Sequence, residues 1–193
     1  MYAMNSQIKA RCPKGVLPRK LEVVVMEPLL PDVPTHIFAI CSSVASQKRR
    51  AVLYPVHGLV VAAHCANLPV LPQSQPQSGA TNVSLPVVPL ALPSPPMFPL
   101  LLAYLYKGRV QEVLSALFPF GVADAAPRDH LKRTIEACSV SGLLSLAMKT
   151  HGLWSIVATL GIFDQPLWRT IEYAWATLLD AIAAKTGSTW HTR

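Results

Sequence analysis

The distribution of proline constrains the fold of this chain more than any other feature of its sequence. The chain has 193 residues, of which 18 are proline, a clear excess over the usual share of about 5%, and most lie in the first half. Because proline lacks a backbone N–H and clashes with the preceding helical turn, it interrupts helices wherever it is frequent. The first half is therefore predicted to form short strands and turns.

Three runs in this first half have the composition of β-strands. They are Leu21–Met26, His36–Cys41 and Arg50–Tyr54. Small and polar residues separate the second run from the third, which predicts a hairpin with Lys48 and Arg49 near its tip.

The next segments are less uniform. His57–Ala66 is compatible with a strand or with a buried helix. Pro72–Asn82 is polar and is predicted to be a flexible loop. Val83–Leu92 is a further strand candidate, and its Pro86 and Pro89 predict an edge or bulged position in a sheet.

From Met97 onward the apolar residues recur at helical spacing. Helices are predicted over 98–106, 110–117, 128–148, 152–163 and 165–186. The last has the clearest signals, because Asp164 can cap it, Pro166 lies in its first turn and Gly187 can end it. Strands followed by helices predict an α+β fold.

Composition limits the classes of function. The chain is 51% hydrophobic and 14% charged, which predicts a folded core, and its net charge of +7 comes from scattered basic residues. Lys48–Arg50 is the densest basic cluster, and no aromatic residues interleave with it as a single-strand-binding groove requires. Direct nucleic-acid binding is therefore not expected, although a basic regulator that contacts DNA stays open as an alternative.

Membrane insertion and secretion are not expected either. Leu85–Tyr106 is uncharged and long enough to span a bilayer, but its prolines would leave backbone groups unsatisfied in lipid. The N-terminus lacks the apolar core of a secretory signal, and the four cysteines form no CxxC pair. The prediction is an intracellular protein, in the nucleus, the cytoplasm or both.

Two segments resemble BTB/POZ domains. His57–Cys65 is similar to the family segment H-x-x-V-L-A-A-x-S, with Cys65 where the family prefers Ser. Phe98–Gly108 is similar to F-x-x-L-L-x-Y-L-Y-T-G, with Lys107 in place of Thr. The resemblance implies a small three-stranded sheet packed against a layer of helices, with a C-terminal helical extension.

A resemblance to one family covers most of the chain. Residues 85–109 and 151–187, the second with Trp154, Trp168 and Trp175, are similar to the clampless-one developmental regulators of basidiomycete fungi. The resemblance implies a regulator of sexual development and clamp-cell formation under mating-type control, which acts by binding other proteins such as transcription factors. A cullin-linked ubiquitin ligase adaptor is the nearest alternative.

The resulting domain prediction has four parts: a basic, loosely ordered N-terminus (1–20), a BTB/POZ-like core (21–118) with a flexible loop (72–82), a helical extension (119–187) and a tail (188–193). Strand-swapped BTB dimers carry a helix before the first hairpin. Pro28, Pro31 and Pro34 argue against such a helix here, so homo-oligomerisation is left open.

No catalytic, cofactor or metal site is predicted. His57, His64 and Cys65 are close in sequence, but no carboxylate lies between Asp32 and Glu112 to orient a Cys–His pair.

Two groups of residues are predicted to matter for folding and for recognition. Those expected to define the fold are His57, Leu59, Val60, Ala63, Phe98, Leu101, Leu102, Leu105, Trp154, Trp168 and Trp175. Those expected to contact a partner are Tyr104, Tyr106, Lys107 and Arg109. The tryptophans are interpreted as core, with an exposed partner groove as the alternative.

Overall fold

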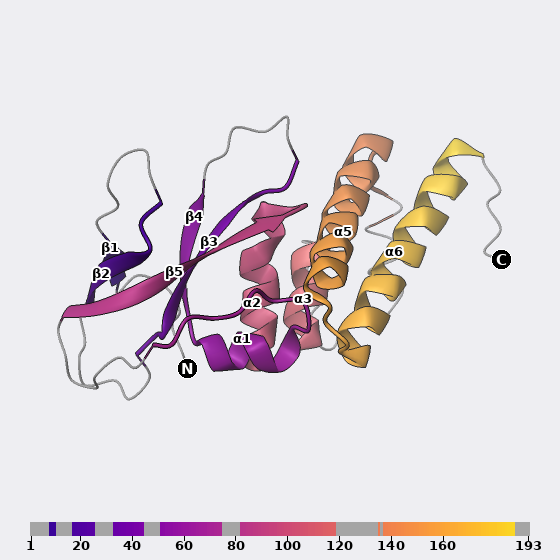
Figure 1. Ribbon diagram of the computed structural model, residues 1–193. Helices are drawn as coiled ribbons and strands as arrows, with labels where there is room; N and C mark the ends of the chain where they lie inside the picture. Colours follow the sequence, from indigo (N-terminus) through magenta and orange to yellow (C-terminus); the bar gives the residue numbers. More distant parts are fainter. Residues whose placement is uncertain are drawn as a thin grey trace. The chain divides into compact units, whose positions relative to one another are not determined.

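The chain forms two compact units, Met1–Pro95 and Pro96–Arg193, in the computed structural model (Figure 1). The structure describes residues 8–10, 17–25, 33–44, 51–74, 82–118, 135 and 137–187. The first unit contains the strands and one helix, and the second unit contains helices. The predicted α+β class is therefore confirmed.

The first unit is built on one sheet with strand order β1-β2-β5-β3-β4 in the part of the chain that the structure describes. The strands are β1 (Ile8–Ala10), β2 (Lys20–Val25), β3 (His36–Ser42), β4 (Val52–Val56) and β5 (Asn82–Leu92). All pairs are antiparallel except β3 with β5, which is parallel.

The prediction of a three-stranded sheet is wrong, because β1 and β2 extend the sheet beyond β5. β1 comes from the segment expected to be loosely ordered, and Ile8 pairs with Val25 in its register. Pairing with a neighbouring strand, rather than composition, gives this short segment its structure.

The central position of β5 and its continuous registers correct a second prediction, since its two prolines indicated an edge or bulged position. Val87 donates its N–H to the carbonyl of Arg19 (2.9 Å), so the backbone polar groups of Val87 and of every second residue from it point toward the side of β2. The backbone nitrogen of Pro89 points to the same side, but the pairing with β2 ends at Pro86, so β2 offers no carbonyl opposite Pro89.

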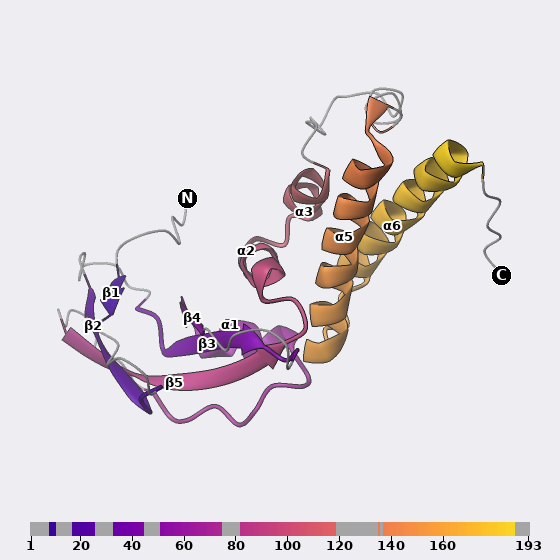
Figure 2. The same cartoon turned by 90° about the horizontal axis from the view of Figure 1, so that it is seen from above.

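The backbone nitrogen of Pro86 points to the opposite side, toward β3. The pairing with β3 begins only at the next residue, Val87. Both prolines therefore occupy ladder positions where no N–H is needed. Strand β5 is curved, and its first half pairs with β2 while its second half pairs with β3 (Figure 2).

The predicted hairpin is confirmed as β3 and β4, with Phe38 opposite Tyr54. Its expected tip, at Lys48 and Arg49, lies outside the described residues, as does most of the loop predicted over 72–82. Within β3, the side chains on both faces are buried from His36 to Ile40, as is common for a strand with a parallel neighbour.

Helix α1 (Gly58–His64) follows the hairpin and settles the ambiguous run as a helix. Leu59 and Ala63 were expected to define the fold, but Leu59 is 83% exposed and Ala63 is also exposed, so neither side chain lies in the core. The helix instead buries Val61 and, at its C-cap, Cys65. Helical phase explains the difference, because side chains three or four positions apart share a face.

The second unit contains α2 (Phe98–Lys107), α3 (Val110–Leu117), α5 (Val140–Leu160) and α6 (Gln165–Thr186). Helix α2 packs against α3 and α5, and α3 also contacts α6. The structure therefore places α2 and α3 with the C-terminal helices, whereas the sequence analysis grouped them with the strands up to residue 118.

The predicted signals of α6 are confirmed. Asp164 accepts a hydrogen bond from the N–H of Leu167 (2.9 Å), Pro166 lies in the first turn, and Gly187 ends the helix with φ 66°. Helix α5 differs from prediction, since it runs unbroken through the expected break near Gly152, which is buried.

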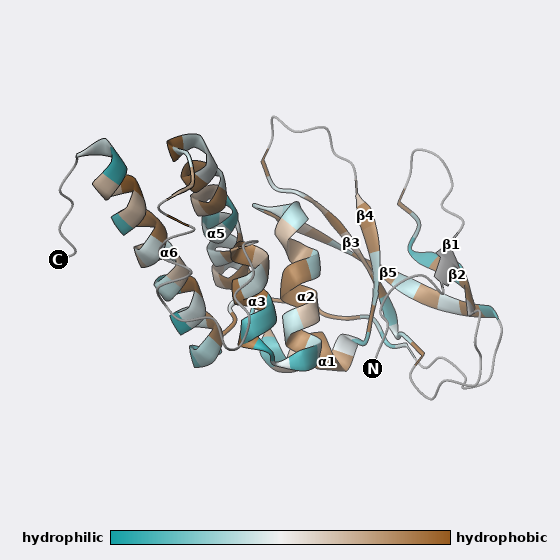
Figure 3. Cartoon of the chain, turned by 180° about the vertical axis from the view of Figure 1, so that it is seen from behind, coloured by the Kyte–Doolittle hydropathy of each residue, from teal (hydrophilic) through white to brown (hydrophobic). Residues whose placement is uncertain are grey.

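The core of the second unit includes the predicted apolar residues of α2, namely Phe98, Leu101, Leu102 and Leu105, all at or below 5% exposure. Helix α5 is apolar along most of its length, whereas hydrophobic and hydrophilic residues alternate along α6 (Figure 3). By length and composition α5 is the one helix of the described part that would suffice to cross a membrane, but half of it is buried within the protein. A core helix has the same properties, and the uncharged run 85–106 is divided between β5 and α2.

Candidate partner-binding surface

The four residues expected to contact a partner do not form one surface. Tyr104 is buried, Tyr106 is half-buried, and Lys107 and Arg109 are exposed. Residues two positions apart on a helix lie on different faces, so Tyr104 and Tyr106 face different surroundings. Because only 6% of Tyr104 is exposed, this residue offers little surface to a partner.

Tyr104 joins α2 to the start of α6 instead. Its hydroxyl donates to Asp164 Oδ1 (2.6 Å), the atom that also accepts from the N–H of Leu167. Burial raises the pKa of Tyr104, and the hydrogen bond to the Asp164 carboxylate raises it further. The phenol therefore stays protonated and keeps its role as donor.

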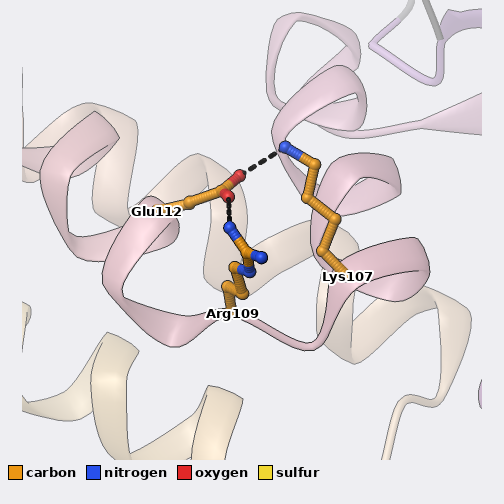
Figure 4. A network of polar contacts seen from close by, with 3 residues as sticks. All are labelled: Lys107, Arg109 and Glu112. Atoms are coloured by element: carbon orange, nitrogen blue, oxygen red, sulfur yellow. Dashed lines mark hydrogen bonds and ion pairs between the residues drawn. The ribbon is translucent and has the colours of Figure 1, made fainter. Parts of the chain in front are cut away.

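Lys107 and Arg109 bind a carboxylate of this same chain. Glu112 Oε2 lies 2.7 Å from Lys107 Nζ and its Oε1 lies 3.4 Å from Arg109 Nη1 (Figure 4). The hydrogen bond from Lys107 is the main cause of a lowered Glu112 pKa. Exposed ion pairs contribute little to stability, so a partner's carboxylate can compete with Glu112 for both cations.

The exposed aromatic side chains gather on α5 and α6. The His151 ring stacks on Trp154 with centroids 5.8 Å apart and lies 6.2 Å from Trp175. Trp154 meets Trp168 edge-on at 6.5 Å. Trp168 is anchored from its polar side, since its Nε1 donates to the carbonyl of Ile162 (2.7 Å).

These tryptophans are not the core residues that the sequence analysis favoured. Trp154 is 46% exposed and Trp175 38% exposed, whereas Trp168 is half-buried. Their neighbours in the sequence, Leu153 and Ala174, are the residues that pack inside. The exposure of Trp154 and Trp175 disagrees with the core interpretation and is compatible with the alternative, an exposed partner groove.

Two apolar side chains extend this cluster along α5. Leu144 is 50% exposed and Met148 70% exposed, and helical spacing places both on the face of His151. We call Leu144, Met148, His151, Trp154, Trp168 and Trp175 the aromatic surface. Single exposed apolar residues are ordinary, but a contiguous group of this kind is typical of a binding site.

The three residues weighed for catalysis differ in their surroundings. Cys65 is buried, and burial raises the pKa of its thiol to about 11, so the nucleophilic thiolate is scarce at neutral pH. His64 is exposed, and His57 is the N-cap residue of α1. Within the described ranges, no group of three or more His, Cys, Asp or Glu side chains is placed to hold a metal ion.

His36 is a structural residue that the sequence analysis missed. Its ring is buried, Nε2 donates to the carbonyl of Pro72 (2.8 Å), and Nδ1 lies 2.8 Å from Thr35 Oγ1. Thr35 Oγ1 in turn accepts from the N–H of Gly58 (2.8 Å). These bonds join β3, α1 and the segment after α1, and no sequence motif marks the set.

Known proteins were compared with the chain in three ways. No match was found among curated proteins or among solved structures. Two family models match, the clampless protein 1 N-terminal domain over residues 1–93 and the clampless protein 1 C-terminal domain over residues 111–193. Because these two matches lie in the expected order and together span most of its length, the chain belongs to the clampless protein 1 family.

Proposed function

We propose that this protein is a non-enzymatic interaction module that controls sexual development in a basidiomycete fungus, including clamp-cell formation under mating-type control. It acts inside the cell by binding other regulators. Membership of the clampless protein 1 family supports the developmental role. The aromatic surface of α5 and α6 supports the mechanism and is the observation that carries the proposal.

Physical reasons connect this surface with protein binding. Tryptophan is enriched among the residues that contribute most to interfaces, because it buries a large area at a low cost in side-chain entropy. Trp154 and Trp175 keep 46% and 38% of their surface exposed. Trp168 is held by its bond to Ile162, so part of the surface is ordered before any partner arrives.

The BTB/POZ-like part of the proposal concerns the region up to α2. The order of a hairpin, helix α1, strand β5 and helix α2 is the order that the resemblance implies. The five-stranded sheet departs from it, so the proposal is a BTB/POZ-like arrangement rather than a standard one.

Purification of the tagged protein from mating hyphae tests the function. The variant Trp154→Ala/Trp175→Ala removes the two exposed rings, and Tyr173→Ala is the matched control, because Tyr173 is 46% exposed on α6 outside the aromatic surface. Circular dichroism verifies that both variants fold.

The wild type and the control should retain the same transcriptional regulators, identified by mass spectrometry, and the double variant should lose them. If the folded double variant retains every partner, the aromatic surface is not the binding site. A cullin in place of transcription factors would assign the protein to ubiquitin ligation.

A further inference from the structure

The charges beside the aromatic surface have a sign opposite to that of the whole chain. The net charge of the chain is +7. Residues four positions apart on a helix are neighbours. The two charged residues at that spacing from Trp168 are Asp164 and Glu172, and both are carboxylates.

The basic residues of these two helices lie at other positions. Lys185 lies ten positions after Trp175, and Lys149 precedes His151 by two positions, so neither shares a stripe with the rings. Arg169 follows Trp168 directly and lies three positions before Glu172, but in the described residues no ion pair joins Arg169 to Glu172. Asp164 already accepts hydrogen bonds from the Tyr104 hydroxyl and from the backbone N–H of Leu167.

Glu172 is the carboxylate available to a ligand. It is exposed, and it lies one turn after Trp168 and one turn before Trp175. In the part of the chain that the structure describes, the ion pairs of carboxylates are those of Glu112 with Lys107 and Arg109. Glu172 therefore adds an unpaired negative charge between two indole rings.

We infer that the aromatic surface binds a basic peptide segment of a partner protein, with an Arg or Lys side chain over the indole rings and paired with Glu172. This inference rests on the proposed function and names the chemistry of its partner. A cation is attracted to the face of an aromatic ring, best of all to tryptophan. An acidic segment would meet Glu172 and Asp164 with like charge, whereas Leu144 and Met148 suit the apolar residues of a basic amphipathic segment.

A direct test uses three fluorescein-labelled helical peptides that differ only in their charged positions, which carry Arg, Gln or Glu between the same leucines. Fluorescence anisotropy with the full-length protein measures the dissociation constant of each. The Arg peptide should bind at least about tenfold more tightly than the Gln peptide, and the Glu peptide most weakly. Equal binding of the three peptides, or failure of the Arg peptide to bind, overturns the inference.

Two charge variants test the position of the cation. Glu172→Gln should weaken binding of the Arg peptide about fivefold. Asp180→Asn is the matched control, since Asp180 is an exposed carboxylate of α6 five positions after Trp175, and it should change nothing. An equal loss in the two variants would mean that a general attraction, rather than Glu172, selects the peptide.

The tryptophan double variant and the charge reversal Glu172→Lys separate this inference from the proposed function. If Trp154→Ala/Trp175→Ala loses its cellular partners and Glu172→Lys retains them, the interaction surface stands and the basic segment is wrong. If light scattering shows concentration-dependent self-association that the tryptophan variant abolishes, the occupant is a second copy and the inference is also overturned.

Discussion

Each of the two units of this protein is stabilised internally by a different kind of interaction. In the first unit, backbone ladders join the five described strands, and the His36 ring with the Thr35 hydroxyl links the sheet, α1 and the segment at Pro72 through partly buried hydrogen bonds. In the second unit, apolar faces of long helices pack together, and Tyr104 supplies a polar link to Asp164.

This difference matters for function, because the proposed recognition surface lies on the helices of the second unit. Among the described residues, no buried side-chain nitrogen or oxygen lacks a hydrogen-bond partner, so each polar link carries a specific requirement for its partner. The helices can expose rings on one face while the opposite face packs, and the aromatic surface uses this freedom.

The largest expected effect comes from placing a charge in the helical core. Leu102→Asp buries a carboxylate at a site that is 2% exposed, and the free energy of unfolding should fall by more than about 4 kcal/mol. Chemical denaturation followed by circular dichroism measures it. The control Leu59→Asp puts the same charge on an exposed residue in the first turn of α1, where the change should stay within about 0.5 kcal/mol. Equal losses would contradict the assignment of these two leucines.

A smaller effect is expected where α1 touches the His36 ring. A Cβ at Gly58 would lie 2.5 Å from His36 Nδ1, so Gly58→Ala should lower the free energy of unfolding by about 1–3 kcal/mol. Gly142→Ala in α5 meets Ser139 Oγ at 3.3 Å and should be close to neutral. Thermal unfolding compares the two, and a neutral Gly58→Ala would show that the close approach does not hold in solution.

The polar link of the helical unit should contribute somewhat less. Tyr104→Phe keeps the packing and removes the donor to Asp164, so the free energy of unfolding should fall by about 1–2 kcal/mol. Tyr173→Phe removes a hydroxyl from an exposed ring of α6 and should be neutral. Urea denaturation resolves such a difference, and identical stability of the two variants would show that the hydrogen bond from Tyr104 to Asp164 does not stabilise the protein.

The smallest perturbation concerns cysteine reactivity, which probes the first unit without a mutation. Because the pKa of Cys65 is raised to about 11, its thiol is almost fully protonated at pH 8, and a buried thiol is also poorly accessible. Cys138 is half-buried and should react with iodoacetamide faster than Cys65, as followed by peptide mass spectrometry. Faster alkylation of Cys65 would indicate that α1 opens readily.

Prediction from the sequence succeeded where the signals are local. The cap at Asp164, the proline in the first turn and the terminal Gly187 define α6 through backbone geometry within a few residues. The hairpin was recognised for the same reason. The burial of Tyr104 against Asp164 was missed, because Asp164 is sixty residues away and no local pattern announces it.

By itself, the sequence determined the α+β order, the positions of most strands and helices, and membership of the clampless protein 1 family, since these depend on residue type and spacing. Only the tertiary structure decided that β5 is central, that Val61 rather than Leu59 is buried, and that Trp154 and Trp175 are exposed. The physical reason is the same in each case. The ladder position of a proline, the buried face of a short helix and the exposure of an indole ring all depend on which distant segments pack against them.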